Sequence, residues 1–380
     1  MGIALTGVVI AIYWATMGLS TSQIGILITL GLLGGTCATL GVSLYADRVG
    51  RRKLLLLISL LSVGGGGALL MHPSFVILCG LTFLGMINGM GRDRMAASSL
   101  EQAILSSGYD VKSRTQTFAW YNVVLDVGHA SGSFLGGLPF FLRHTYKVSD
   151  IASYQWTFLV YCGLIFLSGL FYFGLSKKVE IFNVAKEPIS AASLKRVKRF
   201  AGISFLDSIG GGFLTNALVA YWFFKTFGVS EATIGTLFFT TRIANAFSHL
   251  MAAWLANRVG LLNTMVFSHI PSSLLLMCIP FMATFWSAAI LYFIRECLVE
   301  MDVPTRQSYM ASIVQPKERT FALGMVTVTR NFGWAVSPMV AGDVMNTVSF
   351  STPFFIGPSI KIIYDLLMYT TFRKIHPDSQ

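Results

Sequence analysis

Ionisable side chains interrupt the long apolar stretches of this 380-residue chain, and their types could do acid–base and ion-pairing chemistry. In apolar surroundings a carboxylate resists ionisation and a nearby arginine restores it, so such a pair can take up and release a proton. Glu296 and Glu300 share one helix face, with Arg295 beside them. Eight ionisable residues within the apolar stretches are candidates for binding or proton-transfer chemistry of this kind: Arg92, Asp93, Asp126, Asp207, Arg295, Glu296, Glu300 and Arg330.

Other ionisable residues in these stretches have simpler interpretations. Lys361 and Asp365 lie four residues apart and are expected to neutralise each other as a structural pair. His129 is expected to be a packed or hydrogen-bonded histidine. Four further residues lie toward the ends of their stretches, where we expect them to pair across a closing contact and not to bind a ligand: Arg94, Glu101, Asp302 and Arg306.

The sequence has none of the common enzyme signatures that we sought. It contains no GxxxxGK[ST] phosphate loop and no HExxH motif, and its five cysteines are scattered through apolar runs without a CxxC spacing. We therefore expect no enzyme activity, no catalytic residue, no metal site and no cofactor.

These side chains lie on long apolar segments. Apolar residues make up 54% of the chain and charged residues only 12%, about half the share of a soluble domain. A membrane-spanning helix needs about 20 mostly apolar residues. The sequence predicts an all-α membrane protein with twelve transmembrane helices, near residues 1–17, 23–46, 54–71, 75–98, 116–141, 153–175, 199–224, 232–256, 262–283, 286–312, 320–342 and 352–372.

The basic residues are distributed unevenly between the two sides of this predicted bundle. When the loops are assigned alternately, 18 Lys and Arg fall on one side and 3 on the other, and the richer side is cytoplasmic by the positive-inside rule. We expect a multi-pass protein of the plasma (inner) membrane, with both termini cytoplasmic in the full-length form and without a cleaved signal peptide. The net charge of +11 follows from this asymmetry, so nucleic acid is not expected as a partner.

The chain also contains an internal repeat. The segment from Gly18 to Gly25 recurs from Gly228 to Gly235, and Ala46 to Gly50 recurs as Ala256 to Gly260, both at an offset of 210 residues. This predicts two homologous six-helix bundles, 1–176 and 199–380, joined by a cytoplasmic linker, 177–198. The first span is about ten residues shorter than its counterpart, so we expect a truncated or misassigned start.

Between the second and third spans the sequence reads Asp47-Arg-Val-Gly50-Arg51-Arg52-Lys53. This resembles the signature loop of the major facilitator superfamily, except that Ser43 replaces a glycine. The resemblance covers the whole chain. It implies a gating role for Asp47, Arg48, Gly50, Arg51 and Arg52, which would hold the two bundles together in one state of the cycle. The alternative is that the loop only sets topology. The second copy has Asn257, Leu261 and Leu262 instead, so we expect it to act more weakly.

The fifth span carries glycines at Gly128, Gly132, Gly136 and Gly137. Their spacing resembles the antiporter motif of the same family, although Ser133 stands where the family has proline. In the corresponding part of span eleven, Pro338 is present. The resemblance favours export. Generic helix packing by small residues remains the alternative.

Together these observations predict a secondary active transporter of a small organic solute, working by alternating access between the bundles. Protons are the expected coupling ion, and export is favoured over uptake or uniport. The expected protein is a monomer in the lipid bilayer, of the drug/efflux antiporter type. A transporter-like receptor or sensor without net flux is the alternative from another class, and a channel is a further one. The sequence does not name the solute.

Overall fold

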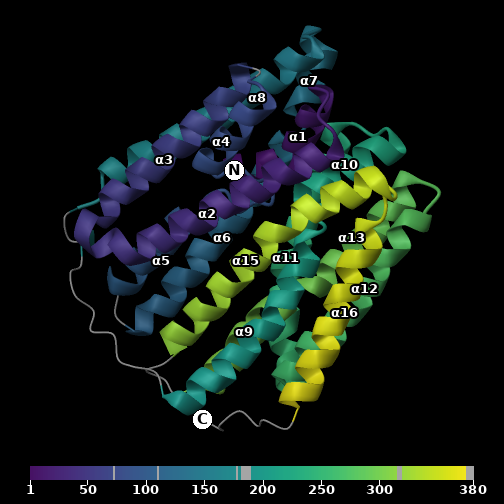
Figure 1. Ribbon diagram of the computed structural model, residues 1–380. Coiled ribbons are helices and arrows are strands. Elements are labelled where there is room, and N and C mark those ends of the chain that lie inside the picture. The colour runs from purple at the N-terminus through teal and green to yellow at the C-terminus, as the bar shows by residue number, and fades with distance from the viewer. Residues whose placement is uncertain (72, 109–110, 177–178, 181–189, 315–318, 374–380) are drawn as a thin grey trace. The chain divides into compact units, whose positions relative to one another are not determined.

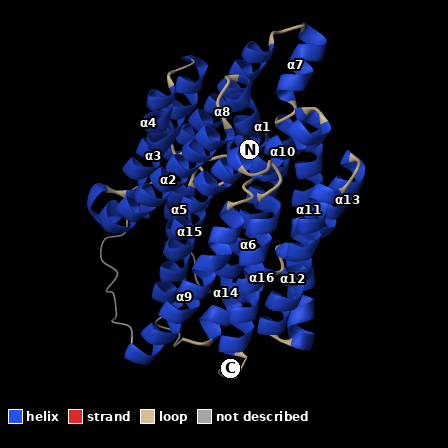
Figure 2. Ribbon diagram, turned by 45° about the vertical axis from the view of Figure 1, so that its right-hand side comes forward, coloured by secondary structure: helices blue, strands red, loops and turns tan. Residues whose placement is uncertain are grey.

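Every element of the described chain is a helix, as Figure 2 shows. The computed structural model describes residues 1–380 apart from 72, 109–110, 177–178, 181–189, 315–318 and 374–380. Within the helices, several side chains also lie outside the described set: 47, 106–108, 111–119, 192, 250, 253, 311 and 319–321. Asp47 is among them. The chain forms two compact units.

The first unit comprises Met1–Val184 and Thr215–Phe239. In it α3 packs along α8, α2 packs against α4, and α1 contacts α6, α8 and α10 (Figure 1). Its helices are α1 (Gly2–Thr16), α2 (Thr21–Val49), α3 (Arg51–Ala68), α4 (Phe75–Gly85), α5 (Met95–Gly108), α6 (Val111–Leu135), α7 (Leu138–Tyr146), α8 (Asp150–Phe173) and α10 (Asn216–Phe227).

The second unit comprises Ala185–Leu214 and Thr240–Gln380. Here α9 packs against α15 and α16, while α12 packs against α13, α14 and α16. The helix α11 (Glu231–Val259) begins in the first unit and continues in the second. The others are α9 (Ala191–Gly212), α12 (Leu261–Cys278), α13 (Phe285–Val299), α14 (Asp302–Ser312), α15 (Arg319–Thr347) and α16 (Pro353–Phe372).

These helices account for the twelve predicted segments, but four of the segments are broken. Spans four, five, seven and ten each form two helices: α4 and α5, α6 and α7, α9 and α10, α13 and α14. Local chemistry accounts for three of the four breaks. Met86, Gly89 and Gly91 adopt positive φ between α4 and α5, Pro139 lies in the first turn of α7, and the Thr215 side chain caps α10.

The repeat is visible in the backbone. Gly50, at +100°, joins α2 to α3, and Gly260, at +89°, joins α11 to α12 at the equivalent position. Gly18 and Gly228, also 210 residues apart, both have positive φ. The compact units cut across the predicted halves, because 215–239 packs with the first unit. The boundaries at 176/177 and 198/199 stay a prediction, and most of 177–190 lies outside the described residues.

Within the described residues, five helical stretches are long and apolar enough to cross a membrane on their own: Thr21–Ala46, Arg51–Met71, Asp150–Phe173, Ser193–Phe227 and Leu261–Phe281. Gly2–Thr16 and Phe75–Gly85 are apolar but shorter, and α16 carries the buried polar side chains of Lys361 and Asp365 near its centre. Those buried polar side chains mark the candidate site.

Candidate substrate and coupling site

Asp207 on α9 lies at the centre of a buried cluster of charges in the second unit. Its Oδ1 accepts a hydrogen bond from Lys361 Nζ on α16 at 2.7 Å. Its Oδ2 accepts one from Arg330 Nη1 on α15 at 2.6 Å, and Arg306 Nη1 on α14 lies 3.4 Å from the same oxygen. Asp207 is 2% exposed and each of the three cations is less than 10% exposed. Three cations therefore converge on one carboxylate.

Small residues allow α9 to approach the helices that carry these cations. A Cβ on Gly210 would lie 2.7 Å from the Gly357 carbonyl oxygen, so α9 and α16 approach with no side chain between them. One on Gly212 would lie 2.7 Å from Ser337 Cβ of α15. The glycines of 210–212 thus bring Asp207 within reach of Lys361 and Arg330.

His269 on α12 extends the cluster to a second carboxylate. Its Nδ1 lies 2.9 Å from Asp365 Oδ2 on α16, and its Nε2 lies 3.4 Å from Lys361 Nζ and 3.6 Å from Asp207 Oδ1. The prediction that Lys361 and Asp365 neutralise each other is therefore wrong. Each has a partner on another helix, Asp207 for Lys361 and His269 for Asp365.

Sequence reasoning did not select His269, although the rule that selected Asp207, an ionisable side chain inside an apolar stretch, applies equally to it. Arg306 and Asp302 were predicted to pair across a closing contact. They pair with each other at 3.0 Å, and Arg306 also reaches Asp207, so the structure joins them to the Asp207 cluster.

A second group in this unit surrounds Glu296 on α13. Glu296 forms an ion pair with the adjacent Arg295 and accepts a hydrogen bond from Asn245 Nδ2 on α11 at 3.3 Å. Glu300 is the C-cap of α13, at the break before α14. Arg295, Glu296 and Glu300 are thus near one another, and within the described residues no hydrogen bond or ion pair joins them to Asp207.

Asp93 of the first unit stabilises the break between α4 and α5. Its carboxylate accepts hydrogen bonds from Thr6 Oγ1 at 2.9 Å and from the Asn88 backbone N–H at 3.2 Å. Arg92 beside it is half-buried, as is Asp126 on α6. These three predicted residues belong to a different unit from Asp207. The contacts give Asp93 a local role, in which it fixes the backbone of the broken span.

Arg94 and Glu101 on α5 form a separate network in the first unit. Arg94 donates to Ser168 Oγ and Tyr172 Oη on α8, both at 2.6 Å. Glu101 accepts from Tyr172 and from Tyr121 on α6. This network holds α5, α6 and α8 together.

The signature loop contains a contact that the sequence did not indicate. The Glu180 carboxylate accepts hydrogen bonds from the backbone N–H groups of Arg51, at 2.6 Å, and Arg52, at 3.1 Å. A carboxylate at a helix N-terminus satisfies unpaired donors and interacts favourably with the helix dipole. Glu180 follows α8 by only a few residues, so it ties the end of the first six spans to the start of α3.

The four glycines of span five contact neighbouring backbone closely. A Cβ on Gly132 would lie 2.0 Å from the Met1 carbonyl oxygen, and one on Gly136 would lie 2.6 Å from Val8 Cβ. A Cβ on Gly137 would lie 2.9 Å from Ala232 Cα of α11, and Gly128 also faces Met1. These positions let α6 approach α1 and the start of α11.

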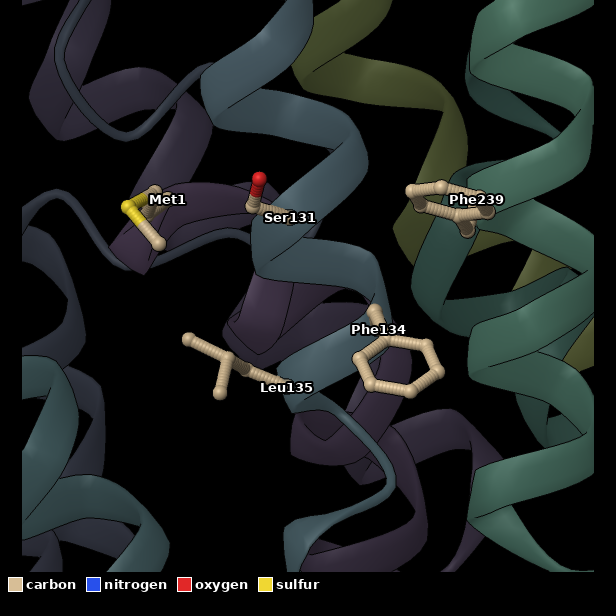
Figure 3. A pocket seen from close by; sticks show the side chains of 5 residues that line it. All are labelled: Met1, Ser131, Phe134, Leu135 and Phe239. Carbon is tan, nitrogen blue, oxygen red and sulfur yellow. The ribbon is translucent and has the colours of Figure 1, made fainter.

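Figure 3 shows a pocket of about 310 Å³ in the first unit, lined by Met1, Ser131, Phe134, Leu135 and Phe239. The Ser131 hydroxyl is its one polar side-chain group and donates to the Val127 carbonyl oxygen at 2.8 Å. Its walls are apolar, and none of the five lining residues has a charged side chain. Among the described residues, no three His, Cys, Asp or Glu side chains are grouped to hold a metal ion.

A buried charge cluster within a duplicated helical bundle is typical of a membrane carrier, and comparison with known proteins agrees. The family model described as Major Facilitator Superfamily matches residues 1–201 and again 200–380. The chain belongs to this superfamily. It is therefore a multi-pass membrane protein of a family of secondary transporters.

Three individual proteins illustrate the range of relatives of this superfamily member. An uncharacterized membrane protein of Saccharomyces cerevisiae, YJR124C, is 22% identical over 98% of this chain and 91% of its own length. A solved structure of the nucleoside transporter NupG has a TM-score of 0.76 at 14% identity, covering 98% and 96%. A D-xylose–proton symporter has a TM-score of 0.73 at 14% identity, covering 97% and 93%. The solved structures establish the shared fold.

Proposed function

We propose that this protein carries a small organic solute across the plasma membrane by alternating access, with protons as the coupling ion. The observation that carries the proposal is the Asp207 cluster, in which a buried carboxylate has competing partners on four different helices. A buried carboxylate that exchanges cationic partners for a proton changes the relative stability of two packings. The 18-to-3 distribution of Lys and Arg supports cytoplasmic termini.

Export is the direction favoured by the glycine spacing of span five, which resembles an antiporter motif. Uptake is the second candidate, and one observation favours it. The cluster pairs three acidic with three basic side chains, so an anionic solute would need an accompanying proton to keep the charge balanced. Proton and solute would then move in the same direction. Among solved structures of this fold, one is by its title a proton symporter.

The proposal is tested on the full chain reconstituted in liposomes that enclose the pH-sensitive dye pyranine. Candidate organic solutes are added outside, and we expect at least one to change the internal pH, with a sign that distinguishes export by exchange from uptake with a proton. Asp207→Asn should abolish this signal, whereas Lys225→Met, at an exposed position, should retain it. Solute flux without any proton movement would contradict coupling, and binding without flux would favour a receptor.

A further inference from the structure

The cations around Asp207 are arranged to hold more than that one carboxylate. Arg330 contacts Asp207 through Nη1, and its guanidinium group lies over the Trp334 ring, 4.6 Å from the centroid. Arg306 reaches both Asp207 and Asp302 through the same atom, Nη1. Within the described part of the chain, each guanidinium thus uses one nitrogen for its ion pairs. The remaining N–H donors leave a fork that suits a bidentate oxyanion.

Asp207 is thus a carboxylate that belongs to the protein and occupies a site suited to carboxylates. Its two oxygens are bound separately, Oδ1 by Lys361 at 2.7 Å and Oδ2 by Arg330 at 2.6 Å. A carboxylate on a solute presents the same two oxygens with the same spacing. Such a group can therefore compete with Asp207 for Lys361 and Arg330.

We infer that the solute carries a carboxylate group, and that this group binds Arg330 and Lys361 in place of Asp207. This inference rests on the proposed function and names the substrate class for the same site. Asp207 is then the resident anion that keeps the cations neutralised while the site is empty.

Charge balance decides how the solute and the proton interact in this site. The groups that face Asp207 come from every helix packed around it: Lys361 and Asp365 on α16, Arg330 on α15, Arg306 and Asp302 on α14, and His269 on α12. With His269 neutral and all three carboxylates ionised, three positive charges balance three negative ones. An additional buried negative charge is costly unless it is compensated. A proton taken up by Asp207 or His269 supplies the compensation, so carboxylate and proton bind together.

A thermal-shift assay on the purified full chain in detergent tests this inference, because a ligand that binds the folded state raises its melting temperature. The probes are sodium lactate, sodium citrate and sodium phosphate, with sodium chloride at matched ionic strength, glucose and choline chloride as references. We expect lactate or citrate to raise the melting temperature above the sodium chloride reference, and more strongly at pH 5.5 than at pH 7.5. Phosphate alone raising it would contradict the carboxylate assignment.

Variants separate this site from general anion effects. Asp207→Asn removes the resident anion, so it should bind the carboxylate about tenfold more tightly and with little dependence on pH. Arg330→Gln should weaken binding at least tenfold, and Arg330→Lys, which keeps the charge without the fork, should lie between. Arg258→Gln, an exposed arginine elsewhere in the second unit, should match wild type. If Asp207→Asn fails to fold, the test rests on Arg330→Lys, whose affinity for the carboxylate should lie between those of wild type and Arg330→Gln.

Three further outcomes would overturn the inference: stabilisation by glucose or choline alone, no carboxylate effect beyond sodium chloride, or equal effects on wild type and Arg330→Gln. The liposome assay distinguishes this failure from failure of the proposed function. Carboxylate binding with the expected variant pattern, but without solute-driven proton movement, would leave the site standing and remove the transport mechanism. Proton-coupled flux of a neutral or cationic solute would support the proposed transport mechanism and contradict the carboxylate site.

Discussion

Lys361 and Asp365 lie one helical turn apart on α16, and each nevertheless has its partner on another helix. A pair of this spacing on an exposed helix contributes only about 0.2–0.5 kcal/mol. Leaving one member of a buried ion pair without its partner costs about 3–5 kcal/mol. Satisfying Asp207 on α9 and His269 on α12 therefore outweighs the local pair.

This difference predicts the result of a double-mutant cycle. Lys361→Met should destabilise the protein by about 3–5 kcal/mol, because it removes a partner of the buried Asp207 carboxylate. The double variant Lys361→Met/Asp207→Asn should regain part of that loss, since it no longer buries the charge. Melting temperatures in detergent measure both, and Lys225→Met at an exposed position should be nearly neutral. Purely additive effects would mean that the two residues are not coupled.

At this scale the sequence identified Asp207 and Arg330 as candidates but did not pair them. Ionisable side chains in apolar stretches can be found from the sequence alone, and such residues usually have a function. The choice of partner depends on which helices pack together, and Asp207 and Lys361 are 154 residues apart. His269 also lies in an apolar stretch and was overlooked, and Glu180 gave no signal because it lies in a polar segment outside the spans.

The element scale is illustrated by the start of α11, where Glu231 is completely buried. Its carboxylate accepts hydrogen bonds from Arg143 Nη2 on α7, at 2.9 and 2.7 Å, and from Tyr154 on α8. Burial alone lowers the pKa of the Arg143 guanidinium, but the Glu231 carboxylate more than offsets this and holds that pKa above its usual value. Within the first unit this contact joins the second repeat to the first. The equivalent position in the first repeat is Thr21.

Glu231→Gln keeps the shape of the side chain and removes its charge. We expect it to destabilise this contact by about 1–3 kcal/mol, since it weakens the charge-assisted hydrogen bonds of a partly buried arginine. Hydrogen–deuterium exchange should increase in residues 138–154 and in the start of α11, while α14 stays unchanged.

Asp150→Asn is the matched control, because Asp150 also contacts Arg143, at 3.3 Å, but is 77% exposed. Exposed ion pairs contribute about 0–1 kcal/mol, so its exchange should resemble wild type. Equal exchange in Glu231→Gln and wild type would remove any role for this contact in holding the two repeats together.

Element boundaries show what hydropathy can and cannot predict. The twelve apolar segments correspond to the observed helices, because burial in lipid requires long apolar runs. The four breaks were not predicted, since each depends on short-range chemistry. Met86 ends α4 with a left-handed backbone, and the connection to α5 is then shaped by the positive φ of Gly89 and Gly91 and by the hydrogen bond that Asp93 accepts from Asn88.

Across the whole molecule, the duplication places equivalent turns in the two repeats. The turns at Gly50 and Gly260 share their geometry but differ in charge. The first copy carries Asp47, Arg51 and Arg52, and Glu180 caps the helix that follows it. The second copy carries Asn257, Leu261 and Leu262, so it lacks the acidic residue and the two arginines of the first. We therefore expect gating by charge to belong to the first repeat.

This asymmetry makes the second copy a control for the first. Asp47→Asn should slow transport about tenfold or more while leaving the apparent affinity within a few-fold, because a gating residue changes the exchange between states and not solute contact. Asn257→Ala should leave both values near wild type, since that position carries no charge to lose. Initial rates in the pyranine liposomes, with a solute that drives proton movement, measure the effect. A wild-type rate in Asp47→Asn would mean that the loop only sets the topology of the chain. A loss of affinity without a loss of maximal rate would mean that Asp47 contacts the solute.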